Sequence, residues 1–179
     1  ANHRSVDGIL GYIRRLGGMV GASDRAERYA SDAQTHIEKI HGAAARLPYR
    51  PKVYFEEWDE PPISAIQWVA ELIRIAGGDD IFPELAAQSL GKARILTDPD
   101  EVIRRAPDLI IGSWCGKKFR PEHVSSRPGW DAIPAVRKGQ IHEIKSPIIL
   151  QPGPAALFDG LDELHRLIAA TALEKTTHD

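Results

Sequence analysis

The chain has 179 residues, of which 42% are hydrophobic, and its 23 basic and 25 acidic side chains give a formal net charge of -2. This length suits one domain with a sizeable core, or a small domain with an appendage. The near-neutral charge without a basic stripe argues against nucleic-acid binding, and no window approaches the roughly 18 apolar residues of a membrane span.

Two helices are predicted at the start of the chain. Ser5 can cap a helix from Val6 to about Leu16, where apolar residues recur at helical spacing, and the Gly pair that follows is expected to end it. Ser23 is the candidate N-cap of a second helix that continues to about Leu47. The apolar content of this second helix is modest and mostly Ala, so we expect a strut that joins two bodies or lies across a surface.

Strand and helix patterns alternate along the rest of the chain. Short β-prone runs predict strands at Lys52–Phe55, Leu109–Ile111 and Gln140–Ile144, and amphipathic patterns predict helices at Ile63–Ala76 and Ala155–Leu173. Such alternation is typical of parallel βα units with right-handed crossovers. We therefore predict an α/β fold with a Rossmann-like parallel sheet flanked by helices.

The remaining segments carry weaker patterns. A short helix capped at Thr97 or Asp98 is predicted before the second strand. The stretch Leu85–Leu96 predicts a loop with a short strand near its end, and Phe119–Val136, rich in Pro, Gly and Trp, predicts an ordered loop with helical turns. Pro147–Pro154 is expected to be extended.

The three predicted strands all end in residues that can bind a ligand. Glu56–Glu60 places four carboxylates around one Trp, a Gly-Ser break after the second strand leads into Trp114 to Lys118, and the third strand runs into a lysine. Because ligands of open α/β sheets bind beyond the carboxyl ends of the strands, we expect one shared rim. The candidate ligand-binding residues at this rim are Glu57, Trp58, Trp114, Cys115, Lys117 and Lys145.

These residue types suit different contacts with a ligand. The rings of Trp58 and Trp114 can stack on a planar molecule, whereas Trp68 is expected in the core and Trp130 as the anchor of a loop. Carboxylates can accept hydrogen bonds from ligand amides or simply form a solvated edge. Lys117 can meet a phosphate or carboxylate of the ligand, or lie on a charged surface loop.

An enzyme is the main alternative from the residues alone. Cys115 beside a lysine has the setting of a nucleophile with a lowered pKa, and the Glu56–Glu60 carboxylates suggest a hydrolase. Cys115 can also ligate a metal together with His123 or His142, yet no HxH, HExxH or CxxC spacing supports a metal site. We therefore expect no catalytic residue, no metal and no resident cofactor.

A resemblance to a known family rests on motifs in a fixed order. These are RPKVYFEEWDEP, the AGG-x-x-IF step, the helix that leads into PDLII, RPGW, and the PGP before the last helix. From Ser5 to Ile168 the chain resembles the second half of the substrate-binding proteins of ABC importers for cobalamin and ferric siderophores, and it is most similar to the cobalamin-binding branch. The chain opens on Ala1 without an initiating Met or an apolar leader, so we expect it to begin within a longer protein.

The resemblance implies two α/β lobes joined by one long helix, with the ligand held between the lobes. Residues 1–21 then correspond to a remnant of the first lobe, 22–48 to the joining helix and 49–179 to the second lobe. Because the first lobe is absent from the sequence, its place is expected to be taken by a missing segment or by a second copy in a homodimer.

The resemblance also implies partners and a location. The ligand would be a cobalamin-like corrinoid or a ferric siderophore, delivered outside the cytoplasm, in the periplasm or at a membrane anchor, to an ABC permease. The acidic residue that docks on the permease corresponds to Asp100 or Glu101. An intracellular corrinoid carrier without a permease stays open as an alternative.

Overall fold

The central element of the computed structural model, which describes residues 3–176, is strand β1 (Lys52–Asp59). One edge of β1 pairs in parallel with β4 (Leu109–Gly112), which in turn pairs in parallel with β5 (Ile141–Glu143). The other edge pairs in parallel with β3 (Asp79–Asp80) and then antiparallel with β2 (Pro62–Ser64). The predicted α/β class with a mainly parallel sheet is confirmed.

The chain reverses its direction of travel across the sheet at β1. Helix α3 (Gln67–Ile75) leads from the β1–β2 hairpin to β3 on one side of β1, and helix α5 (Asp100–Arg105) precedes β4 on the other side. The loops after β1 and β4 therefore diverge from a topological switch point, which is where open α/β sheets bind their ligands.

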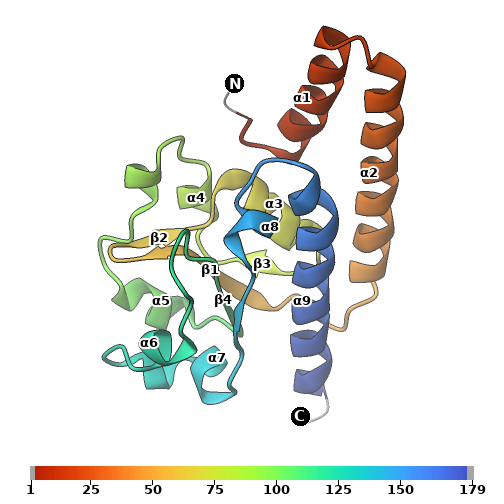
Figure 1. Ribbon diagram of the computed structural model, residues 1–179. Helices are drawn as coiled ribbons and strands as arrows, with labels where there is room; N and C mark the ends of the chain where they lie inside the picture. The colour runs from red at the N-terminus through yellow and green to blue at the C-terminus, as the bar shows by residue number, and fades with distance from the viewer. Residues whose placement is uncertain (1–2, 177–179) are drawn as a thin grey trace.

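Both faces of the sheet are buried under helices, as Figure 1 shows. Side chains alternate along β1, so that Val53 and Phe55 pack on one face and Tyr54 on the other. The first face is covered by α3, by α9 (Leu161–Thr176) and by the N-terminal helices. Burial on both faces explains why β4 reads as a continuous apolar run rather than an alternating one.

Short helices and turns form the layer on the opposite face. They are α4 (Pro83–Ala86), α5, α6 (Pro121–Ser125) and α7 (Pro134–Arg137). Aromatic and branched side chains fill the space between this layer and the sheet, namely Tyr54, Phe82, Val102, Ile110, Trp114, Phe119, Trp130 and Ile133. The long loop predicted between the second and third strands is thus an ordered part of the core.

Helices α1 (Val6–Met19) and α2 (Ser23–Ala44) form a hairpin that extends beyond the sheet (Figure 1). They approach closely, because a Cβ added at Gly17 would lie only 2.2 Å from that of Ala26. The buried residues of α2 are mainly Ala, and α2 also packs against α9. This small-residue stripe explains how a helix with few large apolar residues packs at all.

The ends of these two helices differ from prediction. Ser5 does cap α1, since its Oγ accepts a hydrogen bond from the Gly8 amide at 3.0 Å. However, α1 continues through its Gly pair to Met19, because close packing on α2 compensates for the low helix propensity of glycine. The expected cap Ser23 is wrong: it lies inside α2, which begins after Ala22 without a side-chain cap.

The largest corrections concern the segment around the first strand. β1 does not end at Phe55 but continues to Asp59, and the first residues of the predicted helix Ile63–Ala76 belong instead to β2. The reason is hairpin pairing, which no local pattern shows. Glu57 and Trp58 therefore lie in a strand and not in a loop.

Three other segments also differ. Leu85–Leu96 contains the end of α4 and a 3-10 turn, and its predicted strand is reduced to one bridge between Ile63 and Ile95. The predicted extended stretch Pro147–Pro154 begins in α8 (Ser146–Ile149), because Pro is well placed in a first helical turn. The last helix opens with a π-helical turn at Ala156–Gly160.

Candidate functional site

The carboxyl ends of three parallel strands lie side by side, as predicted. Glu56 of β1 is in register with Gly112 of β4, which is in register with Glu143 of β5. We call the surface formed by residues 56–60, 113–118 and 143–145 the carboxyl rim. The rim stands at the switch point of the sheet, so its position is that of a ligand site.

Glu56 is a buried residue of this rim, and it has no solvent exposure. Its carboxylate accepts four hydrogen bonds: from Tyr54 Oη at 2.9 Å, from Trp114 Nε1 at 3.0 Å, and from Arg127 Nη1 and Nη2 at 2.6 and 2.9 Å. Burying a charge is tolerable only when a partner and hydrogen bonds satisfy it, and here both are present.

The pKa values of Tyr54 and Arg127, which both contact Glu56, are shifted in directions that fit this arrangement. Burial, together with the Glu56 carboxylate, raises the pKa of Tyr54 well above its ordinary value. Burial by itself would lower the pKa of Arg127, but its hydrogen bonds to Glu56 outweigh that effect and raise it. Both groups therefore keep their protons, and Glu56 is closed to substrate, which makes it a poor general acid or base.

An irregularity in β1 determines the positions of Glu57 and Trp58 at the end of the strand. The pairing of Glu56 with Ser64 and of Trp58 with Ile63 leaves Glu57 as an extra residue, a β-bulge. Glu57 then forms a forked ion pair with Arg94, with distances of 2.6 and 3.2 Å. The bulge thus fixes the end of the strand beside the rim.

Trp58 lies partly exposed at the rim and is held on two sides. Its Nε1 donates to the Glu60 carbonyl at 2.9 Å, and Lys117 Nζ lies 4.5 Å from the centroid of its ring. The same ammonium donates to Asp59 Oδ1 at 2.8 Å. Burial alone would raise the pKa of Asp59, but this hydrogen bond and those from the backbone lower it, so the pair stays charged.

The other predicted rim residues are accessible. Cys115 is exposed and unbridged, and Lys145 donates to Glu143 Oε2 at 2.6 Å at the end of β5. The structure thus brings Trp58, Lys117 and the end of β5 to one edge of the sheet. Whether each of them contacts a ligand remains a prediction.

The expectation that the Trp114 ring stands open at the rim is wrong. Its side chain is 4% exposed and packs edge-on against Phe119, with ring centroids 4.8 Å apart. Gly112 makes this possible, because a Cβ at that position would overlap the Phe119 ring at 1.8 Å. Trp68 and Trp130 are buried, as predicted.

Sequence reasoning missed the two arginines that complete the site. Arg94 lies in a 3-10 turn and Arg127 precedes the RPGW turn, and neither carries a local signal of its role. In the sequence, Arg94 lies 37 residues from Glu57, and Arg127 lies 71 residues from Glu56. The only usable hint is that a glutamate in the interior of a buried strand requires a basic partner.

No metal site is present among residues 3–176: no group of three or more His, Cys, Asp or Glu lies close enough to hold an ion. Across the same residues no helix is both long and apolar enough to span a bilayer.

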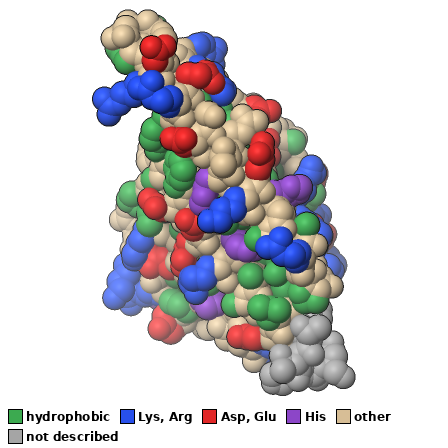
Figure 2. All heavy atoms as spheres, turned by 90° about the vertical axis from the view of Figure 1, so that its right-hand side faces the viewer, with side chains coloured by type: hydrophobic (Ala, Val, Ile, Leu, Met, Phe, Trp, Pro, Cys, Tyr) green, Lys and Arg blue, Asp and Glu red, His purple; other side chains and the backbone are tan. Residues whose placement is uncertain are grey.

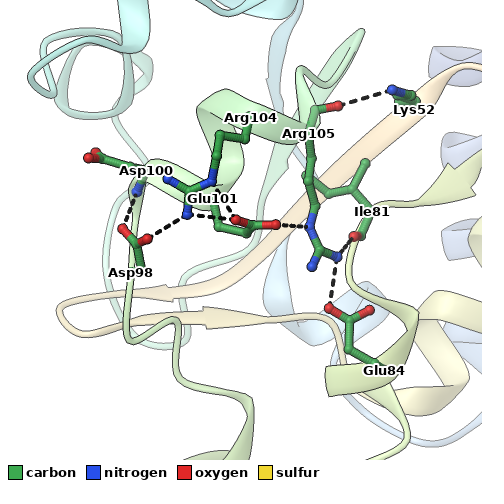
Figure 3. A network of polar contacts seen from close by, with 8 residues as sticks. All are labelled: Lys52, Ile81, Glu84, Asp98, Asp100, Glu101, Arg104 and Arg105. Atoms are coloured by element: carbon green, nitrogen blue, oxygen red, sulfur yellow. Dashed lines mark hydrogen bonds and ion pairs between the residues drawn. The ribbon is translucent and has the colours of Figure 1, made fainter.

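The candidate docking residues lie on α5, in the network shown in Figure 3. Glu101 forms ion pairs with Arg104 at 2.6 Å and Arg105 at 2.9 Å, and hydrogen bonds from these arginines lower its pKa. Arg104 also pairs with Asp98 at 2.5 Å. Asp100 is exposed, and its carboxylate forms no ion pair within the described part of the chain. Of the two candidates, Asp100 has the more available charge.

Comparison with known proteins gives one family and many similar folds. Residues 1–148 match the periplasmic binding protein family. No curated protein sequence matches the chain at a significant level.

Three similar solved structures illustrate the fold. S. aureus IsdE complexed with heme has a TM-score of 0.76 and 18% identity, with 93% of this chain and 66% of that one covered. Vibrio cholerae BtuF, a vitamin B12 binding protein, has a TM-score of 0.71 and 17% identity over 94% and 63% of the two chains. An Fe3+-hydroxamate transport protein of Saccharomonospora viridis has a TM-score of 0.72 and 18% identity over 91% and 56%. The chain spans less than two thirds of each of these proteins.

Proposed function

The chain belongs to the periplasmic binding protein family, and we propose that it is the ligand-capturing second lobe of a substrate-binding protein for an ABC importer. The observation that carries this proposal is the carboxyl rim. Three aligned strand ends at a topological switch point present a partly exposed Trp58 near a buried, hydrogen-bonded Glu56. The proposed contacts are those of the sequence prediction, with Trp114 supporting the rim from beneath rather than stacking on the ligand.

The proposed ligand is a cobalamin-like corrinoid, with a ferric siderophore as the second candidate. Four acidic residues of the rim each pair with a basic one, so the rim has little net charge to offer. A planar ligand that is neutral and carries amides suits such a surface better than a polyanion does. Heme, vitamin B12 and Fe3+-hydroxamate are what the names of similar structures mention, and ligands of the last two kinds are used in the test below.

The proposed architecture places a first lobe against the tip of the α1–α2 hairpin. The tip exposes Leu16, Met19 and Val20, and beside it lies an apolar hollow of about 380 Å3 lined by Tyr29 and Pro154 among others. Figure 2 shows the right-hand side of Figure 1, and the end of the molecule to which this hairpin belongs projects at the top of both views. In this proposal 1–21 is the remnant of the first lobe, 22–48 the joining helix and 49–179 the second lobe; residues 1–2 and 177–179 lie outside the described residues. A homodimer that covers the same tip is the alternative.

Delivery to a permease follows from the same proposal. The protein would act outside the cytoplasm and dock through α5, where Asp100 is the exposed carboxylate and Glu101 is neutralised by two arginines. An intracellular carrier would have the same rim but would have no use for the docking residue.

Catalysis is not part of the proposed function. The family is one of binding proteins, and the Glu56 carboxylate is fully engaged by its four hydrogen bonds. Cys115 stays the single candidate nucleophile of the enzyme alternative. Loss of all function in Cys115→Ser alone would favour that alternative.

The decisive experiment is a titration of the full-length protein with cyanocobalamin, cobinamide and a ferric hydroxamate siderophore, followed by quenching of Trp fluorescence. We expect saturable quenching by one of them at micromolar concentration or below, on the order of –8 kcal/mol of binding free energy. No response to any of these ligands would contradict the importer assignment and leave only the fold.

A further inference from the structure

One face of the Trp58 ring is already occupied by a side chain of this protein. Lys117 Nζ lies 4.5 Å from the ring centroid, within the range of a cation–π contact. Trp58 and Lys117 come from different elements, β1 and the loop after β4, so their contact bridges the two strand ends between which the chain reverses direction. A planar ligand that stacks on this face has to displace the ammonium.

The position of Lys117 is fixed by its neighbours on both sides. Gly116 adopts φ +73, a left-handed conformation that glycine reaches without strain, and this turns the loop before Lys117. Asp59, next to Trp58 in the strand, accepts a hydrogen bond from the same ammonium at 2.8 Å. The carboxylate therefore holds the cation near the ring.

We propose that Lys117 competes with the ligand for the face of Trp58, with Asp59 holding it in place until the ligand displaces it. This inference rests on the proposed function and makes it more specific. Lys117 thereby sets how strongly a planar ligand has to stack before it binds.

The energies are small enough for such competition. A cation–π contact at an exposed site is weak, and the Lys117 side chain is 42% exposed. A flat macrocycle covers far more of the indole than one ammonium group does, so a large planar ligand displaces Lys117, whereas a small solute does not. Lys117 is the exposed member of its pair with Asp59, which is only 12% exposed. Salt therefore screens the pair in part, and binding of an uncharged planar ligand should tighten modestly as ionic strength rises.

The first test needs no ligand. Trp68, Trp114 and Trp130 are 6%, 4% and 1% exposed, so within this chain acrylamide quenching reports mainly on Trp58. In the full-length protein, Lys117→Ala should raise the quenching constant, while the control Lys138→Ala, at an exposed lysine outside the rim, should not. The increase should disappear in a Trp58→Phe background. Equal quenching of the wild type and Lys117→Ala would overturn the proposal that Lys117 occupies one face of the Trp58 ring.

The second test uses cyanocobalamin, which has no net charge. Lys117→Ala should lower the Kd by about two- to fivefold, the factor that a weak cation–π contact corresponds to, and should remove the salt dependence. The control Lys138→Ala should leave both the Kd and its salt dependence unchanged. A Kd that rises or stays the same in Lys117→Ala, while the wild type binds, would overturn the competition alone. Absence of binding by every variant would overturn the proposed function, together with the role of Lys117 in it.

Discussion

The carboxyl rim and the tip of the α1–α2 hairpin both lie at the surface, but they differ in whether their side chains have partners within the described part of the chain. At the rim, Glu56, Glu57 and Asp59 all have a basic partner within the chain. At the tip, Met19 and Val20 are 83% and 68% exposed and contribute apolar surface that residues 3–176 leave uncovered. A polar surface that is complete without a partner can bind and release a ligand, whereas an apolar patch of this kind marks a lasting contact.

The largest effect is expected from removing the buried partner at the rim. Glu56→Gln leaves Arg127 without its carboxylate, and breaking a buried pair costs about 3–5 kcal/mol, a value that is an upper bound here because the Arg127 side chain is 18% exposed. Urea denaturation would measure the loss. The exposed Glu60→Gln is the control and should change stability by less than about 0.5 kcal/mol. Equal stability of the two variants would mean that the rim does not depend on its buried ion pair.

Asp80 provides the opposite case, a buried carboxyl that forms no ion pair among the described residues. Burial is the main cause that raises its pKa from 3.8 to about 7. Because the folded-state pKa is the higher one, ionisation opposes folding, and stability should fall as pH rises from about 4 through about 7 and then level off. Asp80→Asn should remove this decline and stabilise the protein at pH 8 by on the order of 1 kcal/mol or more.

Denaturation of wild type and Asp80→Asn at pH 5 and pH 8 tests this directly. A stability difference that is the same at both pH values would contradict the raised pKa. Asp79→Asn is the neighbouring control, since Asp79 is exposed and paired with Arg50.

The apolar tip can be tested by introducing a charge. Val20→Asp should destabilise the full-length protein by about 1–2 kcal/mol if a first lobe covers the tip, because the charge would replace buried apolar area. Thermal unfolding would measure this, with the exposed Arg28→Asp of the same hairpin as control. No difference between the two variants would show that nothing covers the tip.

The smallest effect is expected from the exposed ring of the rim. Trp58→Ala should weaken ligand binding by on the order of 1 kcal/mol or more without changing stability, since one stacking surface is lost. Isothermal titration calorimetry would measure the affinity, because Trp58→Ala removes a tryptophan whose fluorescence reports on binding. Cys115→Ser should leave the affinity unchanged. Unaltered binding by Trp58→Ala would remove this ring from the site.

The sheet was predictable where the pattern is local. The run Leu109–Ile111 predicts a strand buried on both faces, and the shared level of the three strand ends follows from their parallel direction. The β1–β2 hairpin was not predictable, because its register depends on pairing between Glu56 and Ser64 rather than on any periodicity. A helix pattern at the start of the next segment concealed β2.

The candidate site was predictable in its location but not in its partners. Carboxylates, lysines and tryptophans near strand ends are visible in the sequence, whereas the pairing of Glu56 with Arg127 spans 71 residues. Burial of Trp114 depends on the ring of Phe119 and on the missing side chain of Gly112, which only the folded chain brings together. Sequence thus identifies the rim, and tertiary contacts decide which of its rings is free.

Strand β1 carries core residues and site residues only a few positions apart, and this limits how the strand can change. Val53, Tyr54 and Phe55 are fully buried, and Trp58 follows only three positions later in the same strand. Because side chains alternate between faces up to the bulge at Glu57, a one-residue insertion among Val53, Tyr54 and Phe55 would exchange the two faces and disrupt core and site together. The first part of this strand can therefore change by substitution only, whereas an extra residue can be accommodated at the bulge at Glu57 or in the loop after Ser113.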